Sequence, residues 1–372
     1  MKRLLLPLLA LCCVGCERQP AADPGIDVAS ALGGEAAAGF ARALEPRHFV
    51  FPGDHNAHPD FRNEWWYVTG QLQSPEGEHF GYQVTFFRIA LAAKDAERPS
   101  AWATRQVWMA HTALTDLDGA THEHASRLSR GALNLAGQTS NPFRLWLEDW
   151  SIQGAEDGAF PWQLRLATEG FALDLTLKPE RAPLLQGAEG LSQKSADAGN
   201  ASYYYSITRL ATQGTLVRAG KTVSVSGLSW LDREWSTSAL GKDQVGWDWF
   251  SLQLDNGDDL MLYRLRDQSG STDPYSAGTL LSSKGVRQPL AAKDFGLEPL
   301  RWWESPAGAR YPVEWRLTIP GSAIELRVEA LLDDQEMDTG IRYWEGAVSV
   351  RSADSTRRLG QGYLEMSGYG RN

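Results

Sequence analysis

Residues 64–72 read Glu-Trp-Trp-Tyr-Val-Thr-Gly-Gln-Leu, and a Pro-Glu-Gly turn leads from them into an apolar strand that ends at Phe87-Arg88. Residues 247–254, Trp-Asp-Trp-Phe-Ser-Leu-Gln-Leu, begin a second copy of this pattern, with an Asn-Gly turn and a strand that reaches Arg266. In both copies an aromatic strand and an apolar strand form a hairpin. The repeat predicts two β domains in tandem, joined near residues 235–245. A single elongated sandwich is the alternative.

The rest of the chain beyond its N-terminal region consists of short segments in which apolar and polar residues alternate, with turns rich in glycine between them. These segments are residues 80–90, 164–177, 222–230, 311–319, 323–331 and 344–350. Brief strands at this spacing predict an all-β protein of the sandwich or barrel type. We expect few helices, all of them short, near residues 93–98 or 291–295.

The N-terminus has the pattern of a bacterial lipoprotein signal. Met1-Lys2-Arg3 is followed by an apolar run from Leu4 to Val14 and then by Gly15-Cys16. The run is too short to cross a bilayer, and a small residue precedes the cysteine that would take the lipid. We therefore expect lipidation at Cys16; an ordinary cleaved signal peptide is the alternative. Because no Asp follows Cys16, we expect an envelope protein on the periplasmic side, anchored in the outer membrane.

Composition excludes several classes of function. The three cysteines, Cys12, Cys13 and Cys16, lie at the signal, so the mature chain has no thiol for catalysis and no disulfide. The formal net charge is −10 and no basic cluster occurs, so nucleic acid is not an expected partner. Fifteen Trp, eleven Tyr and twelve Phe exceed what one ordinary core needs. This aromatic content favours a pocket for an apolar ligand.

The segment 227–235, Gly-Leu-Ser-Trp-Leu-Asp-Arg-Glu-Trp, carries the strongest candidate chemistry. In a strand, Trp230, Asp232 and Glu234 point to one face, and the intervening residues point to the other. If the first face lines an aromatic cavity, burial and mutual repulsion would keep one carboxyl protonated, as a general acid requires. The alternative is that Asp232 and Glu234 form salt bridges with Arg233 or a neighbouring arginine.

The histidines give weaker indications. His55 and His58 lie in an Asp- and Asn-rich loop. The two histidines could belong to a zinc site, or the loop could be solvated or form the rim of a pocket. No third histidine stands at a characteristic spacing, so we expect no metal. His111 lies in an apolar strand, where it is either a hydrogen-bonded core residue or part of the pocket.

Longer motifs carry a family resemblance. They are residues 51–70 and 81–88, the segments 227–235 and 246–250, Tyr343-Trp-Glu-Gly346, and residues 362–369. This set resembles the AttH-like proteins grouped with hydroxyneurosporene synthase (CrtC, carotenoid 1,2-hydratase), over nearly the whole body. The resemblance implies two consecutive lipocalin-like antiparallel β-barrels. We therefore expect a signal peptide at 1–16, a flexible tether at 17–47, and lipocalin-like domains at 48–238 and 239–372.

The resemblance also implies an activity and partners. The carotenoid branch adds water to a terminal isoprenoid double bond without a cofactor, and its aromatic-x-Asp strand matches Trp230-x-Asp232. The AttH-like branch tends to be exported and to accompany transporter permeases, so an ABC transporter is an expected partner. We expect no cofactor. The residues expected to bind a ligand are Trp230, Tyr205, Trp249, His111, Trp66, His55 and Arg88.

Three hypotheses follow for the function. The first is a membrane-anchored lipoprotein that binds a lipid, isoprenoid or polyene in a lipocalin-like cavity beside an envelope ABC transporter. The second is a cofactor-free hydratase or cyclisation enzyme with Asp232 as general acid and Glu234 tuning it. The third is a structural envelope protein, which leaves the aromatic content unexplained.

Overall fold

The computed structural model describes residues 38–94, 99–155, 158–238 and 240–370. The predicted signal peptide, Cys16 and most of the tether lie outside the described residues. Residues 38–47, predicted as the end of the tether, pack on the body instead. Ala43 is buried in the core of the first sheet, and the Thr237 hydroxyl donates a hydrogen bond to the carbonyl of Ala41. Apolar side chains at Phe40 and Ala43 explain this packing.

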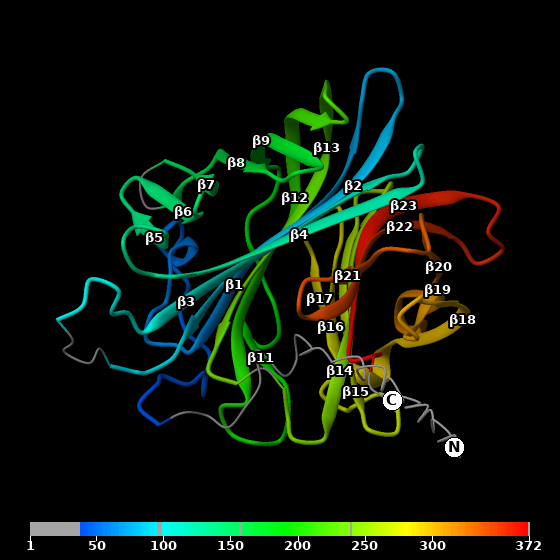
Figure 1. The fold of residues 1–372 in the computed structure, drawn as a ribbon. Coiled ribbons are helices and arrows are strands. Elements are labelled where there is room, and N and C mark those ends of the chain that lie inside the picture. The colour runs from blue at the N-terminus through cyan, green and yellow to red at the C-terminus, as the bar shows by residue number, and fades with distance from the viewer. Residues whose placement is uncertain (1–37, 95–98, 156–157, 239, 371–372) are drawn as a thin grey trace, which may run out of the picture.

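The chain forms two large antiparallel sheets (Figure 1). Among the described residues, the first sheet contains β1 (Asn63–Gln73), β2 (His79–Ala90), β3 (Gln106–Asp116), β4 (Thr121–Arg130), β5 (Ala136–Ser140), β6 (Phe143–Leu147), β7 (Trp150–Gln153), β8 (Trp162–Ala167), β9 (Phe171–Pro179), β10 (Leu184–Leu185), β11 (Leu191–Gln193), β12 (Ala201–Arg218) and β13 (Lys221–Ser236). The second contains β14 (Gln244–Leu254), β15 (Asp259–Asp267), β16 (Ala277–Leu281), β17 (Arg287–Ala291), β18 (Gly296–Glu304), β19 (Arg310–Ile319), β20 (Ile324–Ala330), β21 (Glu336–Asp338), β22 (Arg342–Ser352) and β23 (Arg358–Ser367). Short 3-10 helices occur at η1 (Gly53–His55), η3 (Ala292–Asp294) and η4 (Pro320–Ser322).

The two sheets share one topology. Each begins with a four-strand meander, β1 to β4 or β14 to β17, and the first strand of the meander pairs with the last strand of its sheet. β1 therefore pairs with β13, and β14 pairs with β23. The predicted repeat corresponds to the β1–β2 and β14–β15 hairpins. Because strands twist, each sheet curls into a near-closed barrel, and the prediction of two lipocalin-like barrels is confirmed. No described helix is long and apolar enough to cross a membrane.

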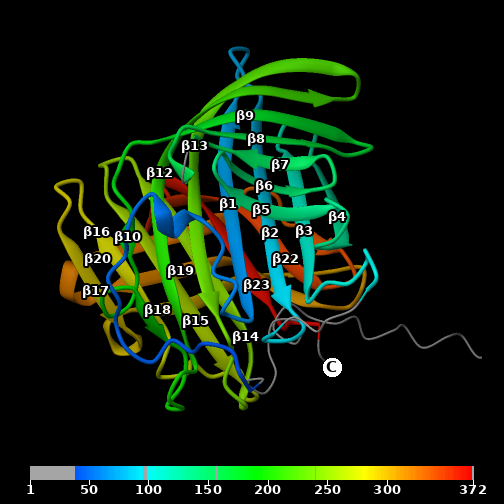
Figure 2. The same cartoon turned by 90° about the vertical axis from the view of Figure 1, so that its left-hand side faces the viewer.

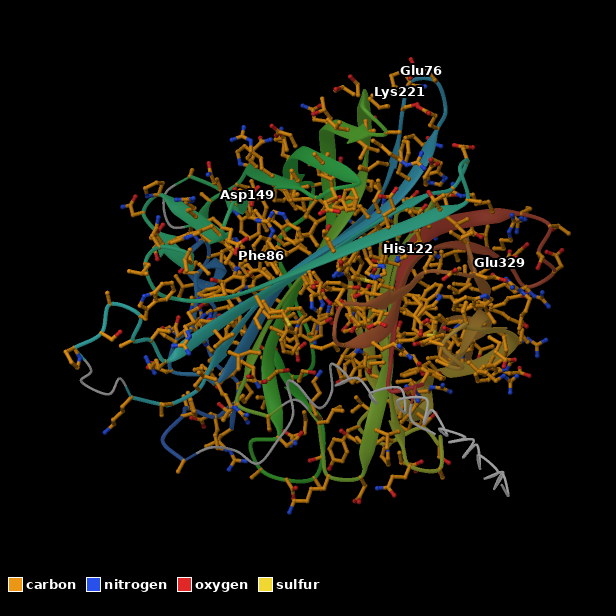
Figure 3. All side chains as sticks on the ribbon, in the orientation of Figure 1. Glu76, Phe86, His122, Asp149, Lys221 and Glu329 are labelled. Carbon is orange, nitrogen blue, oxygen red and sulfur yellow. The ribbon has the colours of Figure 1, made fainter. Side chains whose placement is uncertain are left out.

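The barrel interiors are filled by side chains, as Figure 3 shows around Phe86. In β1, Trp66 and Val68 point into the first barrel, whereas Tyr67 points toward the second. The second barrel has a comparable core built around Trp315 and Trp344. Central strands are therefore buried on both faces, because one face packs inside its barrel and the other against the neighbouring barrel.

The sheets contact each other through β1, β2, β3 and β12 of the first and β14, β22 and β23 of the second. Figure 2 shows β22 and β23 behind β1 to β3. The sheets approach each other closely at Gly81, since a Cβ atom there would lie 2.6 Å from the Cβ of Ala347. The first sheet ends at Ser236 and the second begins at Gln244. The exact domain bounds stay a prediction.

Candidate functional site

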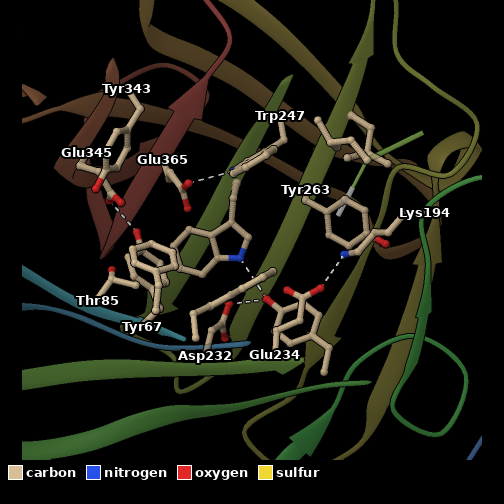
Figure 4. A pocket seen from close by; sticks show the side chains of 16 residues that line it. Tyr67, Thr85, Lys194, Asp232, Glu234, Trp247, Tyr263, Tyr343, Glu345 and Glu365 are labelled. Carbon is tan, nitrogen blue, oxygen red and sulfur yellow. Dashed lines mark hydrogen bonds and ion pairs between the residues drawn. The ribbon is translucent and has the colours of Figure 1, made fainter. Parts of the chain in front are cut away.

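A cavity lies between the outward faces of the two barrels, with a free volume of about 760 Å³, its open mouth included (Figure 4). Its walls come from both sheets and are formed by Trp65, Tyr67, Thr85, Phe87, Lys194, Tyr204, Asp232, Glu234, Leu240, Trp247, Trp249, Tyr263, Leu265, Tyr343, Glu345 and Glu365. This cavity does not lie inside either barrel as the cavity of a lipocalin does, because both interiors are packed with side chains of the described residues.

Asp232 on β13 is buried at the base of this cavity. Its Oδ1 accepts hydrogen bonds from Ser206 Oγ at 2.5 Å and from Trp230 Nε1 at 2.6 Å, and its Oδ2 accepts one from the Tyr204 hydroxyl. Tyr204 in turn accepts a hydrogen bond of 3.1 Å from Trp249 Nε1. Burial raises the pKa of Asp232 to about 7, although these three donors oppose the rise. The group is therefore poised to release and regain a proton near neutral pH.

Glu234, two residues further along β13, has a different environment. Lys194 Nζ lies 3.2 Å from its Oε1, and the Ser202 hydroxyl donates a hydrogen bond to the same oxygen. Burial lowers the pKa of Lys194, but Glu234 and Tyr263 more than offset this effect and leave it raised. The ammonium group also lies 4.1 Å from the centre of the Tyr263 ring. Glu234 thus forms a buried ion pair with lysine, whereas Asp232 has no such partner among the described residues.

Two further carboxyl groups come from the second barrel. Glu345 on β22 and Glu365 on β23 are directly opposite in the strand register, so their side chains share one face. The Tyr67 hydroxyl donates to Glu345 Oε2 at 2.6 Å, and Trp247 Nε1 donates to Glu365 Oε1 at 3.0 Å. Burial raises the pKa of Glu365 to about 8, and burial and Glu365 together raise that of Glu345 well above its usual range.

The sequence of the AttH-like family matches residues 42–369 of this chain. The chain belongs to the AttH-like family. A crystal structure assigned as AttH, from Nitrosomonas europaea, is 35% identical in sequence with a TM-score of 0.79, and the match covers 89% of this chain and all of that one. Kievitone hydratase from Nectria haematococca shares the fold, with a TM-score of 0.64, 15% identity, and coverage of 88% and 97%. Among curated proteins, none matches the chain.

The structure of this AttH-like protein brings some predicted residues together and separates others. Asp232, Glu234 and Trp249 line the cavity, and Trp230 supports it through its hydrogen bond to Asp232. His111 lies just behind the wall, where its Nδ1 is 2.7 Å from the Tyr343 hydroxyl. Burial lowers the pKa of His111 to about 4, so the ring is neutral at physiological pH.

Four residues predicted to bind the ligand lie away from the cavity. Tyr205 and Trp66 point into the first barrel, and the Tyr205 hydroxyl is 2.6 Å from His55 Nδ1. Strand alternation explains why Tyr205 on β12 lies away from the cavity, because Tyr204 and not Tyr205 shares the face of the cavity. Arg88 is fully buried against Glu64.

The loop that contains the histidines is held by ionic contacts with the barrel. Glu64 is buried between Arg88 and Arg233, with 2.6 Å from its Oε2 to Arg233 Nη2. Arg233 also lies 3.6 Å from the centre of the Trp66 ring. Burial would raise the pKa of Glu64, but Arg88 and Arg233 hold it well below its usual range. Arg233 therefore pairs with Glu64 and not with Asp232 or Glu234, so the proposed salt bridge on β13 is absent from the described residues.

Histidines of this loop have partners within the protein. His58 stacks on Trp235 with 3.7 Å between ring centres, and its Nε2 lies 3.2 Å from Asp54. Burial lowers the pKa of His55 to about 3. No group of three or more His, Cys, Asp or Glu side chains among the described residues could hold a metal ion.

The raised pKa values make stability depend on pH. Asp232 and Glu365 keep protons in the folded chain that the unfolded chain has already lost at neutral pH, so the folded state binds more protons. The free energy of unfolding should therefore fall by at least about 1 kcal/mol between pH 7 and pH 9. Buried histidines with lowered pKa values, such as His55 and His111, contribute only below their usual pKa, so they do not affect this window.

Urea unfolding across this pH range measures the effect. A Glu365→Gln variant cannot ionise at that position and should show a flatter profile than the wild type. Glu329→Gln is the matched control, because the Glu329 side chain is 39% exposed, pairs with Arg351 and lies on the outer surface (Figure 3). A wild-type stability that is flat or rises over this range would contradict buried, protonated carboxyl groups.

Proposed function

We propose that this AttH-like protein is a cofactor-free acid–base enzyme that adds water to a carbon–carbon double bond of an apolar, isoprenoid-like substrate. The observation that carries the proposal is Asp232, a carboxyl group buried in an aromatic cavity with a pKa near 7 and no ion-pair partner among the described residues. The neighbouring kievitone hydratase shares only the fold, and its name makes hydration the first reaction to test.

The geometry suits proton donation by Asp232. As the proton passes to a substrate carbon, the π bond breaks, a C–H bond forms and a carbocation results. The negative charge that appears on Asp232 is stabilised by the Ser206, Trp230 and Tyr204 donors, which are already in place. The rings of Trp249 and Tyr67 offer faces to the cation.

Water then attacks the carbocation, and the proton that Asp232 donated is replaced. A C–O bond forms, and the proton that the added water loses returns to the Asp232 carboxylate. The net reaction is alkene plus water to alcohol, with no change of oxidation state, so a redox cofactor is not required. If an internal double bond attacks the cation in place of water, the same site would give cyclisation.

A binding protein without chemistry is the second candidate, favoured by the open mouth and the apolar walls of the cavity. For either function we propose that the chain is a lipoprotein anchored through Cys16 and works beside an envelope transporter. A lipid anchor would place the cavity next to a membrane that supplies apolar molecules.

Mass spectrometry of the protein purified from its host's membranes tests both the proposed lipid anchor and the proposed alkene ligand. Under denaturing conditions, the mass should correspond to a chain that begins at an acylated Cys16. Under native conditions, we expect a stoichiometric isoprenoid or similar alkene that organic solvent extracts. An unprocessed or unacylated chain would contradict the anchor, and a ligand without any double bond would contradict the proposed hydration.

A further inference from the structure

One wall of the cavity carries two carboxyl groups that lack a counter-ion. Among the described residues, neither Glu345 nor Glu365 forms an ion pair with Arg, Lys or His. Each receives a single hydrogen bond, from Tyr67 and from Trp247, on one of its two oxygens. The second oxygen of each group has no protein partner in the described part of the chain. Figure 4 shows both groups turned toward the aromatic side chains of the cavity.

The other charges of the cavity are already matched. Lys194 is the one basic residue among the lining side chains of the described chain, and it pairs with Glu234. Asp232 receives three hydrogen bonds, which are suited to its ionised form. Glu345 and Glu365 have no paired cation, and each accepts only one hydrogen bond from the described residues.

Two ionised carboxylates directly opposite each other on paired strands repel, and burial without a cation increases the cost. The arrangement is stable when the pair keeps its protons. A protonated carboxyl group in an apolar site is a strong hydrogen-bond donor. Glu345 Oε1 and Glu365 Oε2 are the atoms left to donate.

We propose that Glu345 and Glu365 form a neutral carboxyl pair that donates a hydrogen bond to an oxygen atom of the bound molecule. The cavity would therefore take apolar alcohols, aldehydes or ketones in preference to plain hydrocarbons or anionic lipids. An oxygen atom of the ligand accepts a hydrogen bond from the protonated carboxyl group. A hydrocarbon has no acceptor and leaves this proton without a hydrogen-bond partner. An anionic head group would be buried beside four carboxyl groups with no unpaired cation among the described residues.

This inference rests on the proposed function, because it concerns the substrate of the same cavity, but its test measures binding and not turnover. Calorimetry at neutral pH should compare farnesene, farnesol, farnesal and farnesoate, which share one isoprenoid chain and differ at its end. We expect farnesol and farnesal to bind the wild type about tenfold more tightly than farnesene or farnesoate. Equal affinity for farnesene and farnesol, or farnesoate binding as tightly as farnesol, would overturn the proposal.

Variants of Glu345 and Glu365 test whether these two residues cause the preference for ligands that contain oxygen. A Glu345→Leu, Glu365→Leu double variant should bind farnesol no better than farnesene, whereas the double Gln variant keeps an N–H donor and should retain the preference. Glu329→Gln should bind as the wild type does. A preference that survives in the folded double Leu variant would assign oxygen recognition elsewhere and overturn the proposal. Asp232→Asn should keep the wild-type order of affinities, so a loss of turnover alone leaves this inference standing.

Discussion

An Asp232→Asn variant is expected to lose turnover by at least about a hundredfold, because a general acid contributes roughly 10² to 10⁴ in rate. Asn keeps the size of the side chain and an oxygen that accepts from Ser206 and Trp230. Its amide group can also donate to the Tyr204 hydroxyl in place of accepting from it. The variant should therefore fold, with a Tm within a few degrees of the wild type, while it cannot supply the proton.

The assay is conversion of the alkene recovered from the purified protein, followed by mass spectrometry. Asp174→Asn is the matched control, since Asp174 on β9 pairs with Arg165 far from the cavity and its side chain is 48% exposed. This control should convert the ligand at the wild-type rate. Activity should also decline as the pH rises above about 7, because the protonated form of Asp232 is the donor. Full activity in Asp232→Asn would remove this residue from the mechanism.

A Glu64→Gln variant is expected to destabilise the protein by about 3–5 kcal/mol. Glu64 is fully buried between Arg88 and Arg233, and both guanidinium groups are fully buried as well. The neutral amide cannot balance two positive charges that have no access to water. Because this cluster fixes the register of β1 against β13, we expect cooperative loss of the whole first barrel.

Urea unfolding at neutral pH measures this effect. Asp149→Asn provides the comparison, because Asp149 pairs with Arg127 at the surface with its side chain 67% exposed. An exposed ion pair of this kind contributes less than about 1 kcal/mol. Similar small effects from both variants would show that the buried cluster does not hold the barrel together.

Much of the fold was predictable from local pattern. The aromatic hairpin at residues 64–88 and its copy at 247–266 predicted two β domains in tandem, and the family resemblance implied that they are barrels. The two curled sheets with a shared topology confirm the barrels. Alternation along 227–235 also predicted that Asp232 and Glu234 share a face. These features depend on neighbouring residues in the sequence or on a repeat, which a single sequence displays directly.

The location of the cavity was not predictable in this way. It lies between the barrels, and its lining combines residues of β13 with residues of β22 and β23 that are more than 100 positions away in the sequence. Lys194, Glu345 and Glu365 were therefore missed. Glu345 lies in the motif Tyr343-Trp-Glu-Gly346 and Glu365 in the closing motif. An acidic residue within an otherwise apolar strand segment is the signal that could have identified them.

His55, Trp66 and Arg88, predicted to bind the ligand, lie away from the cavity for the converse reason. Their motif is specific and rich in chemically active side chains, but it forms the buried ionic and aromatic contacts that close the first barrel. From the sequence, a buried structural cluster and a binding site have the same composition. Only the direction of each side chain separates them.

Isotope labelling tests the central claim most directly. The alkene recovered from the host protein is incubated with the purified wild type in water enriched in oxygen-18 and, separately, in deuterium oxide. We expect an alcohol that carries one solvent oxygen and one carbon-bound deuterium, formed by the wild type and by Asp174→Asn but not by Asp232→Asn. A ligand that returns unchanged from the wild type, or one that Asp232→Asn converts equally well, would contradict acid-catalysed hydration in this cavity.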